Sequence, residues 1–260
     1  MGCNKVEPQI FVAPNGARKS RQDHEALPLD IGEIVITAHE CFKAGAIGLH
    51  AHVRDENGRH ILDGGLYREL IGEMEVKVPA MQVQITTEAV GMYTPFEQRE
   101  LVREVRPKMV SVSMAEMFRD DDLAAISRFY YWAKEQDIEI QHIVYSAQEF
   151  LLLSKRMLMG TIPARQKSVL FVLGRYEKNQ QSDPSMLKPF LDVLKSLRQA
   201  DDWRFMVCAF GIGETDCLVA AAKAGGDCRV GFENNFLHRD GRMARDNADR
   251  VSALRRALAE

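Results

Sequence analysis

The sequence predicts a (β/α)8 barrel, and three observations lead to this expectation. First, short apolar runs alternate with amphipathic stretches throughout the 260 residues, which is typical of α/β proteins with a parallel sheet. Second, eight such strand-then-helix units fit the length of this barrel class. Third, no low-complexity linker interrupts residues 1–260, so we expect a single domain. A doubly wound open sheet is the alternative, but no glycine-rich dinucleotide fingerprint follows the first strand.

The individual elements follow from the same alternation. In chain order, the strand-like runs cover residues 9–13, 46–53, 80–86, 109–113, 139–145, 168–174, 204–210 and 227–232. The amphipathic stretches between them predict helices at residues 31–44, 65–77, 95–104, 120–136, 146–159, 184–198, 213–224 and 244–258. Several of these helices begin at a capping residue or at a proline of the first turn, namely Asp30, Thr94–Pro95, Ser146 and Asp183–Pro184.

The composition is that of an ordinary soluble globular protein, with 46% hydrophobic and 27% charged residues. A formal net charge of −3 argues against nucleic acid or an anionic membrane as the main partner. No apolar stretch approaches the roughly 20 residues of a membrane span, and no signal-type apolar core follows a basic N-terminal region. The five cysteines are dispersed without a CxxC pair, which favours reduced thiols and a cytoplasmic location; they are Cys3, Cys41, Cys208, Cys217 and Cys228.

Two histidines stand out near the end of the second predicted strand. Chemistry in a (β/α)8 barrel lies at the carboxyl ends of the strands, and His50 and His52 fall there. Residues i and i+2 of a strand point to the same face, so the two imidazoles lie side by side, a common geometry for two ligands of one metal ion. The spacing alone is unspecific, because hydrogen-bonded barrel histidines would show it as well. Arg54 and Asp55 follow in the next loop, which we expect them to orient.

The end of the eighth predicted strand supplies a candidate for a third ligand. The stretch CRVGFENN carries Arg229, Glu233 and Asn234 just before a polar loop. In a closed barrel the second and eighth strands both neighbour the first, so Glu233 can reach an ion held by the histidines across the barrel mouth. A helix-capping or loop-ordering role is the alternative for this cluster.

Several stretches together resemble the β-keto acid cleavage enzymes, the family typified by 3-keto-5-aminohexanoate cleavage enzyme. They occur in the family's order over essentially the whole chain and are GAIGLHAHVRDENGRH, LYRELI, VQITTEAVG, LFVLG, GGDCRVGFENN and DGRMARDNADRV. The resemblance implies a (β/α)8 barrel, usually a homotetramer, with Zn²⁺ or another divalent metal held by His50, His52 and Glu233. It also implies an enzyme that condenses a β-keto acid with acetyl-CoA and yields acetoacetate and a new CoA thioester.

The resemblance further implies roles for residues around the ion. Arg229 matches an arginine that supports the acid–base step, while Thr86 and Ser111 match hydroxyl residues at the ends of the third and fourth strands. Asn234 departs from the family pattern, which has an aspartate at this position. An amide cannot take up a proton as a carboxylate does, so the usual pairing of aspartate with arginine is broken here.

Two carboxylates are candidates for the missing proton carrier. Glu88 follows the third predicted strand and Glu116 follows the fourth, so both lie near the rim. We hypothesise that one of them has taken over proton transfer. The alternative is that each forms an ion pair with a nearby arginine, such as Arg18 or Arg119.

Candidates for substrate binding lie in two loops. Asn15 and Arg18 belong to a basic loop after the first strand, which could hold a substrate carboxylate or the phosphates of coenzyme A. Arg18 stands where the family has a glutamate, and Arg175 and Tyr176 follow the sixth strand in place of a glycine-rich loop. The added basic residues favour an anionic substrate. A solvated loop or a subunit contact is the alternative interpretation of the first loop.

Two other functions stay open on the sequence. A metal hydrolase or lyase on the same barrel would use a zinc-activated water without CoA, and the replaced aspartate keeps that function possible. The other is a metal-bearing barrel that binds a ligand without catalysis. Such a protein would not need all three metal ligands together with the hydroxyl residues at the rim, so their presence argues against it.

Overall fold

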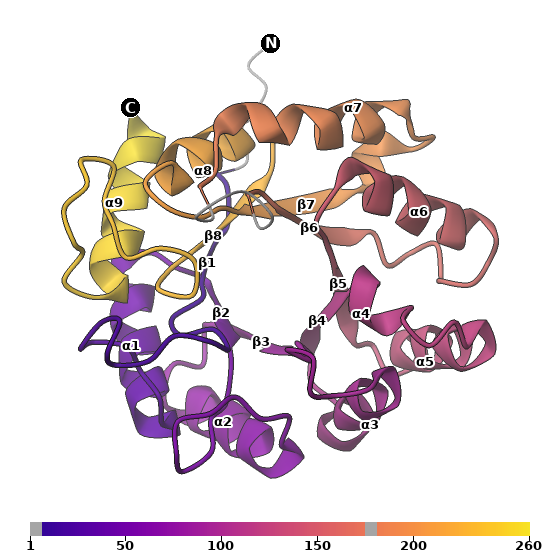
Figure 1. Ribbon diagram of the computed structural model, residues 1–260, viewed down its shortest axis with the longest axis horizontal. Coiled ribbons are helices and arrows are strands. Elements are labelled where there is room, and N and C mark those ends of the chain that lie inside the picture. The colour runs from indigo at the N-terminus through magenta and orange to yellow at the C-terminus, as the bar shows by residue number, and fades with distance from the viewer. Residues whose placement is uncertain (1–6, 175–180) are drawn as a thin grey trace.

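The computed structural model describes residues 7–174 and 181–260, whose strands close into one parallel barrel (Figure 1). The strands follow one another around the barrel in chain order, and β8 pairs with β1 to complete it. Their bounds are β1 Ile10–Val12, β2 Gly48–Ala51, β3 Gln82–Thr86, β4 Met109–Ser113, β5 Glu139–Val144, β6 Ser168–Val172, β7 Arg204–Cys208 and β8 Asp227–Val230. The predicted (β/α)8 barrel is therefore confirmed, and the open doubly wound sheet is excluded.

Helices cover the outside of the barrel (Figure 1). Their bounds are α1 Ile31–Ala44, α2 Gly64–Lys77, α3 Pro95–Val105, α4 Met114–Met117, α5 Leu123–Glu135, α6 Ala147–Leu158, α7 Lys188–Ser196, α8 Glu214–Lys223 and α9 Asn247–Ala259, with 3₁₀ helices η2 Pro184–Leu187 and η3 Ala200–Asp202. The side chains of Asp30, Thr94 and Ser146 cap α1, α3 and α6 as predicted, and Asp183 caps η2.

Two regions differ from the elements that hydropathy predicts. The helix α4 begins directly after β4, because the Ser113 hydroxyl at the strand's end accepts a hydrogen bond from the Glu116 N–H at 3.4 Å. The helix predicted at residues 184–198 is divided into η2 and α7, and each piece has a proline in its first turn. Proline favours the first turn of a helix and interrupts a helix interior, so each proline marks a new start.

The apolar core has two layers, one between the strands and the helices and one inside the barrel. The larger layer includes Leu49 of β2 and Val110 of β4, which face the helices. The inner layer fills the barrel with side chains from β1 and from β4 to β7: Phe11, Met109, Ile143, Leu170, Val172, Met206 and Cys208. A Cβ atom on Gly48 would overlap the Phe11 ring, so the glycine is what lets this ring occupy the barrel interior beneath His50.

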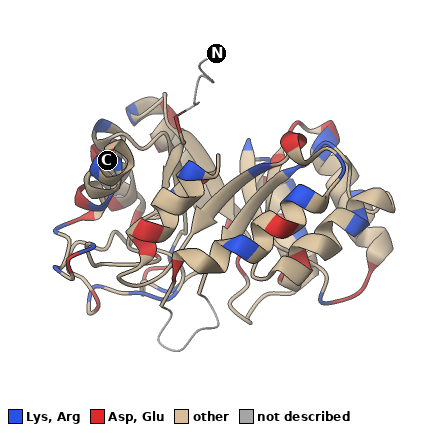
Figure 2. Ribbon diagram, turned by 90° about the horizontal axis from the view of Figure 1, so that it is seen from above, with Lys and Arg blue, Asp and Glu red and all other residues tan. Residues whose placement is uncertain are grey.

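None of the helices in residues 7–174 and 181–260 is long and apolar enough to cross a membrane. Basic and acidic residues are interspersed along the helices in the view of Figure 2. The four cysteines that the structure describes are buried free thiols; they are Cys41, Cys208, Cys217 and Cys228.

Candidate metal centre and active site

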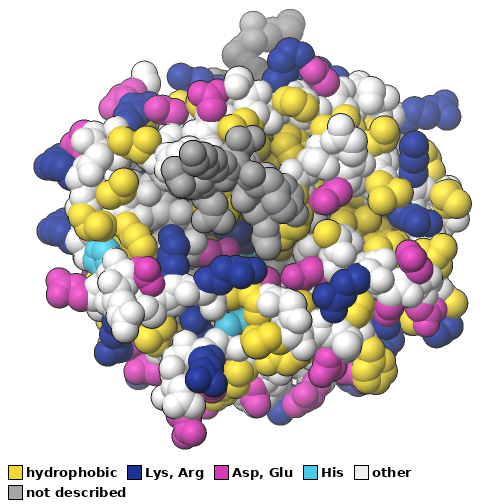
Figure 3. Space-filling view, in the orientation of Figure 1, with side chains coloured by type: hydrophobic (Ala, Val, Ile, Leu, Met, Phe, Trp, Pro, Cys, Tyr) yellow, Lys and Arg dark blue, Asp and Glu magenta, His cyan; other side chains and the backbone are white. Residues whose placement is uncertain are grey.

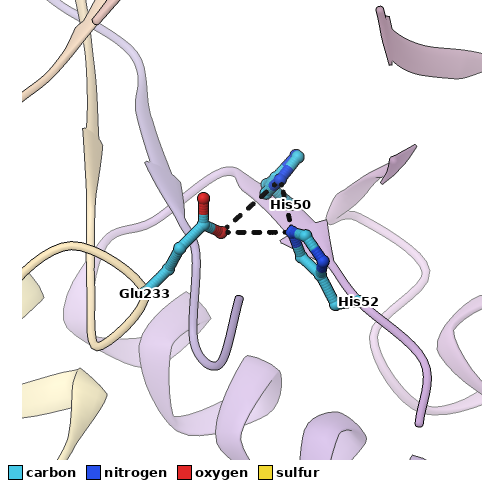
Figure 4. A group of neighbouring side chains, drawn as sticks. All are labelled: His50, His52 and Glu233. Carbon is cyan, nitrogen blue, oxygen red and sulfur yellow. Dashed lines mark hydrogen bonds and ion pairs between the residues drawn. The ribbon is translucent and has the colours of Figure 1, made fainter. Parts of the chain in front are cut away.

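Three of the predicted site residues meet at the barrel mouth (Figure 4). His50 lies in β2, His52 lies just after it, and Glu233 follows β8. The Nε2 atoms of the two histidines are 3.2 Å apart, and each lies 3.5 Å from Oε2 of Glu233. The three side chains thus direct one nitrogen or oxygen atom each toward a common point.

Strand β1 brings these ligands together because it pairs with both β2 and β8. The chain after β1 then passes beside Glu233, whose N–H donates to the Ala13 carbonyl at 3.0 Å. Gly16 makes the close approach possible: its φ is +61°, and a Cβ atom there would lie 2.5 Å from Cγ of Glu233. Only glycine adopts this backbone region readily and also leaves the space free.

The hydrogen bonds of His50 leave a lone pair on the nitrogen that faces the common point. Its Nδ1 lies 2.8 Å from Oε1 of Gln84, an oxygen that only accepts, so Nδ1 carries the proton. Gln84 is itself oriented by Gln141, whose Oε1 accepts a 3.3 Å hydrogen bond from Nε2 of Gln84. Burial, together with the charge of Arg229, lowers the pKa of His50 to about 3, so the ring is neutral.

Glu233 supplies a negative charge at the same point. Burial alone would raise the pKa of this carboxyl, but neighbouring positive charge, above all that of Arg229, outweighs burial and holds the pKa well below its usual value. Its Oε1 accepts a 3.0 Å hydrogen bond from Arg229, whereas its buried Oε2 has no hydrogen-bond donor among the described residues. A buried carboxylate oxygen without a donor costs free energy unless a cation satisfies it.

The three atoms fit a metal ion of the size of zinc. Zinc–ligand bonds of about 2.0–2.1 Å at tetrahedral angles place neighbouring ligand atoms about 3.3 Å apart. The separations of 3.2 Å and 3.5 Å lie within a few tenths of an ångström of that value. Two imidazoles and one carboxylate are also a donor set that catalytic zinc sites use, with one position left for a substrate.

Arg229 presents unused donors beside this centre. Its Nη2 donates to Glu233 and, at 3.5 Å, to the Cys208 thiol. Burial alone would lower the pKa of Arg229, but the charge of Glu233 outweighs burial and raises it, so the side chain is charged. The buried Nε and Nη1 atoms have no acceptor within residues 7–174 and 181–260. A bound anion would satisfy them.

The centre opens into a cavity of about 460 Å³ at the mouth of the barrel. Charged groups at its wall come from the loop after β1 and from the ends of β3, β4 and β8, while the β5–β7 side is mainly apolar. The lining residues include Arg18, Lys19, His50, Thr86, Glu88, Ser111, Ser113, Glu116, Ile143, Tyr145, Val172, Phe210, Arg229 and Glu233. Figure 3 shows basic and acidic side chains together around the centre of this face.

The hydroxyl residues predicted from β3 and β4 lie side by side in that wall. Thr86 and Ser111 are register partners in the sheet, and the Ser111 hydroxyl donates to the Thr86 hydroxyl at 3.4 Å. The Thr86 oxygen also accepts a hydrogen bond from the Glu88 N–H at 3.0 Å. The end of β3 is thus ordered next to the centre.

The two candidate proton carriers have different surroundings. Glu88 lies between Arg18, at 3.6 Å, and Nε2 of His52, at 3.9 Å. The Oε2 atom of Glu116 accepts hydrogen bonds from the Ala89 N–H at 3.0 Å and from Gln98 at 2.9 Å. Glu116 therefore holds the loop after β3 in place, and Glu88 lies nearer the ligands.

One of the ion pairs proposed as alternatives for these glutamates is present. Arg18 does pair with Glu88, and its side chain is largely exposed at the cavity rim. Arg119 instead donates to the Tyr93 carbonyl at 2.7 Å.

Two asparagines predicted for the site occupy different environments. Asn15 is buried in the cavity wall, where its amide nitrogen donates to the His52 carbonyl at 2.9 Å and its oxygen accepts from the His52 N–H at 3.4 Å. This pairing fixes the backbone of a ligand. Asn234 is buried, and both polar atoms of its amide lack a partner among the described residues. The predicted substrate-binding residues Arg175 and Tyr176 lie outside the described residues.

Gln84, the hydrogen-bond partner of His50, was not predicted from the sequence. Gln84 and Thr86 stand two residues apart in β3, and residues at this spacing point to the same face of a strand. The predicted position of Thr86 at the site could therefore have indicated that Gln84 also faces the barrel interior. Arg54 is placed as expected for an orienting residue, because its guanidinium donates to the carbonyls of Gly16 and Lys19 in the loop after β1.

The sequence matches known proteins over nearly its full length. Residues 9–260 match the model of a family described as beta-keto acid cleavage enzyme. The 3-keto-5-aminohexanoate cleavage enzyme of Fusobacterium nucleatum subsp. nucleatum is 25% identical over 264 residues, which cover 96% of this chain and 91% of that protein. The 3-oxoadipate:acetyl-CoA acetyltransferase of Cupriavidus necator is 23% identical, with 94% of this chain and 86% of that protein covered.

A solved structure shares the fold. ObcA in a binary complex with oxaloacetate superposes with a TM-score of 0.65 at 17% identity; the match covers 90% of this chain but 64% of ObcA, so the chain spans less than two thirds of that protein. At this identity the likeness shows the barrel alone. The family match is broader evidence, since it covers every strand and the residues at the barrel mouth. The chain belongs to the beta-keto acid cleavage enzyme family.

Proposed function

We propose that this protein condenses a β-keto acid with acetyl-CoA on a bound zinc ion and releases acetoacetate and a new acyl-CoA. The observation that supports this proposal most directly is the triangle of His50, His52 and Glu233, which lies beside Arg229 N–H groups that have no acceptor among the described residues. Relatives that are named as a keto acid cleavage enzyme and as an acetyl-CoA acetyltransferase support the same reaction class.

The protein's own side chains have distinct tasks in this proposal. A divalent ion held by the three ligands would polarise the keto and carboxylate oxygens of a β-keto acid as a Lewis acid. Arg229 would bind an oxygen of the substrate through its Nε and Nη1 groups, which no acceptor in the described part of the chain occupies. Thr86 and Ser111 line the cavity beside the ligands and would donate hydrogen bonds to an oxygen that gains negative charge.

The condensation needs a base for the carbon between the two carbonyl groups of the keto acid. We assign this task to Glu88, because its carboxylate borders the cavity beside His52 and Arg18. Glu116 is the less suitable candidate, since one of its oxygens already accepts two hydrogen bonds that hold the loop after β3. Asn234 has no exchangeable carboxyl proton to contribute.

The cavity also favours a class of substrate. Arg18 and Lys19 contribute positive charge at one side, and a carboxylate on the far end of the keto acid would complement them. We therefore propose a keto acid that carries a second carboxylate at its far end, a class that includes the 3-oxoadipate named for one relative. Asn15 would act on binding indirectly, through the backbone of His52 that it holds.

The direct test is a coupled assay of the purified protein with a panel of β-keto acids that includes 3-oxoadipate. We expect acetoacetate and a new acyl-CoA to appear together only when acetyl-CoA is present. A chelator should abolish turnover, and added zinc should restore it. Consumption of keto acids at the same rate without acetyl-CoA would instead assign a CoA-independent hydrolase or lyase. A protein that binds zinc and keto acids but converts none of them would be a binding barrel.

We also propose a homotetramer that works in the cytoplasm. Large apolar side chains on and just after α6 are exposed and would be covered by neighbouring subunits; they are Leu152, Leu158 and Met159. The four described free thiols suit a reducing compartment. Light scattering coupled to size exclusion measures the mass in solution directly, and a monomer would contradict the proposed assembly.

A further inference from the structure

The chain after β2 turns back on itself and brings a third histidine to the metal ligands. Arg54 and His60 form an antiparallel bridge, and the turn between them is closed by the Gly58 N–H, which donates to the Asp55 carbonyl at 2.9 Å. This turn places the imidazole of His60 against that of His52, with Nδ1 atoms 3.4 Å apart and ring centroids 5.0 Å apart. Only 3% of His60 is exposed to solvent, so water does not compete for this contact.

The second nitrogen of His60 determines the direction of that contact. Nε2 lies 2.8 Å from the backbone carbonyl of Glu88, and a carbonyl oxygen only accepts. Nε2 of His60 therefore carries the proton, and Nδ1 of the neutral ring is an acceptor. Nδ1 of His60 therefore accepts a hydrogen bond from the Nδ1–H group of His52. The other nitrogen of His52, Nε2, is then left with a lone pair directed at His50 and Glu233.

We propose that His60 is a positioning residue: it fixes the tautomer and ring orientation of His52 for the metal and ties this ligand to the backbone of the proton carrier Glu88. The inference rests on the proposed metal-dependent function. Gln84 plays the corresponding part for His50, so each histidine ligand has its own hydrogen-bond partner. Partners of this kind typically change metal affinity or activity by about 10–100-fold when they are removed.

Two substitutions separate the two contacts of His60. In His60→Asn the amide oxygen takes the place of Nδ1 and can still accept from His52, while the contact to the Glu88 carbonyl is lost. In His60→Gln the amide nitrogen takes the place of Nε2 and can still donate to that carbonyl, while the contact to His52 is lost. The two variants are similar in polarity and differ mainly in which contact they keep.

The experiment measures zinc affinity by competition with a chelating dye and the visible spectrum of the Co²⁺-substituted protein, with kcat and KM alongside. We expect His60→Asn to keep zinc affinity within about threefold and to lose kcat. For His60→Gln we expect a loss of zinc affinity of about 10–100-fold and a changed Co²⁺ spectrum. The melting temperature of the metal-free protein serves as the control for a purely structural effect.

The results distinguish this inference from the proposed function. If the wild-type protein binds neither zinc nor cobalt at the three ligands, the proposed function itself fails. If it binds metal but both variants keep full affinity, or both lose affinity in proportion to their melting temperature, the positioning role of His60 is refuted while the proposed function stands.

Discussion

The approach of Gly16 to Glu233 gives the sharpest test of the metal site, through Gly16→Ala. The new Cβ atom would lie 2.5 Å from Cγ of Glu233 and 3.1 Å from its Cβ. Carbon atoms in van der Waals contact are about 3.5–4.0 Å apart, so the glutamate arm must move by about 1 Å. Metal–ligand distances tolerate deviations of only about 0.2 Å, so Glu233 would no longer coordinate in its place.

Two effects of this substitution can be separated by magnitude. Alanine at a φ of +61° costs about 1–2 kcal/mol of folding free energy through the backbone alone. Displacing one ligand should in addition weaken zinc binding by at least 10-fold, which corresponds to about 1.4 kcal/mol of binding free energy. We expect urea denaturation of the metal-free protein to report the first effect and chelator competition to report the second.

Gly160→Ala is the matched control, because Gly160 has a φ of +76° and nothing lies within 4 Å of an added Cβ atom. It should lose a similar folding free energy and keep full zinc affinity. Wild-type zinc affinity in Gly16→Ala would refute the reasoning, since the clash with Glu233 would then have been relieved without moving the ligand. An equal loss of affinity in both variants would trace the effect to general destabilisation.

Three further predictions concern other residues. Glu88→Gln should lower kcat by about 10²–10⁴-fold, as expected for removal of a general base, whereas the kcat of Glu116→Gln should stay within about 10-fold of the wild-type value. Near-native kcat values in both variants would reject the hypothesis that one of these glutamates has taken over proton transfer. Arg54→Ala should lower kcat/KM by about 10–100-fold by freeing the loop after β1, and added guanidinium should recover part of it. Arg250→Met should cost about 3–5 kcal/mol of folding free energy in urea denaturation, because it leaves the buried Glu214 unpaired, and Arg250→Met/Glu214→Gln should recover stability.

The order of strands and helices could be predicted from the sequence because hydrophobic periodicity and capping residues are local signals. Strand ends were harder to predict. The run at 46–53 contains a strand of only Gly48–Ala51, so His52 lies beyond the paired ladder although the apolar pattern continues. Hydropathy records which residues are buried, and it does not record where the hydrogen bonds between neighbouring strands stop.

The ligands could be predicted in part for a similar reason. The spacing of His50 and His52 is visible in the chain, and barrel closure together with the family resemblance pointed to Glu233. Gln84 and Gln141 were missed because their partners are distant in sequence: Gln84 is separated from His50 by 34 positions, and Gln141 from Gln84 by 57. Such pairs become evident only when the register between strands is known.

The contrast between Glu233 and Asn234 bears on how the site differs from the usual family pattern. Glu233 is fixed by Gly16, Arg229 and the histidines, so a change there would disturb the metal centre. Asn234 is buried, its amide has no partner among the described residues, and it is not among those that line the cavity. A carboxylate at this position would be a buried charge that needs a counter-ion, and Arg229 already pairs with Glu233. An amide avoids that cost, and Glu88, which Arg18 balances at the open rim, can then supply the base.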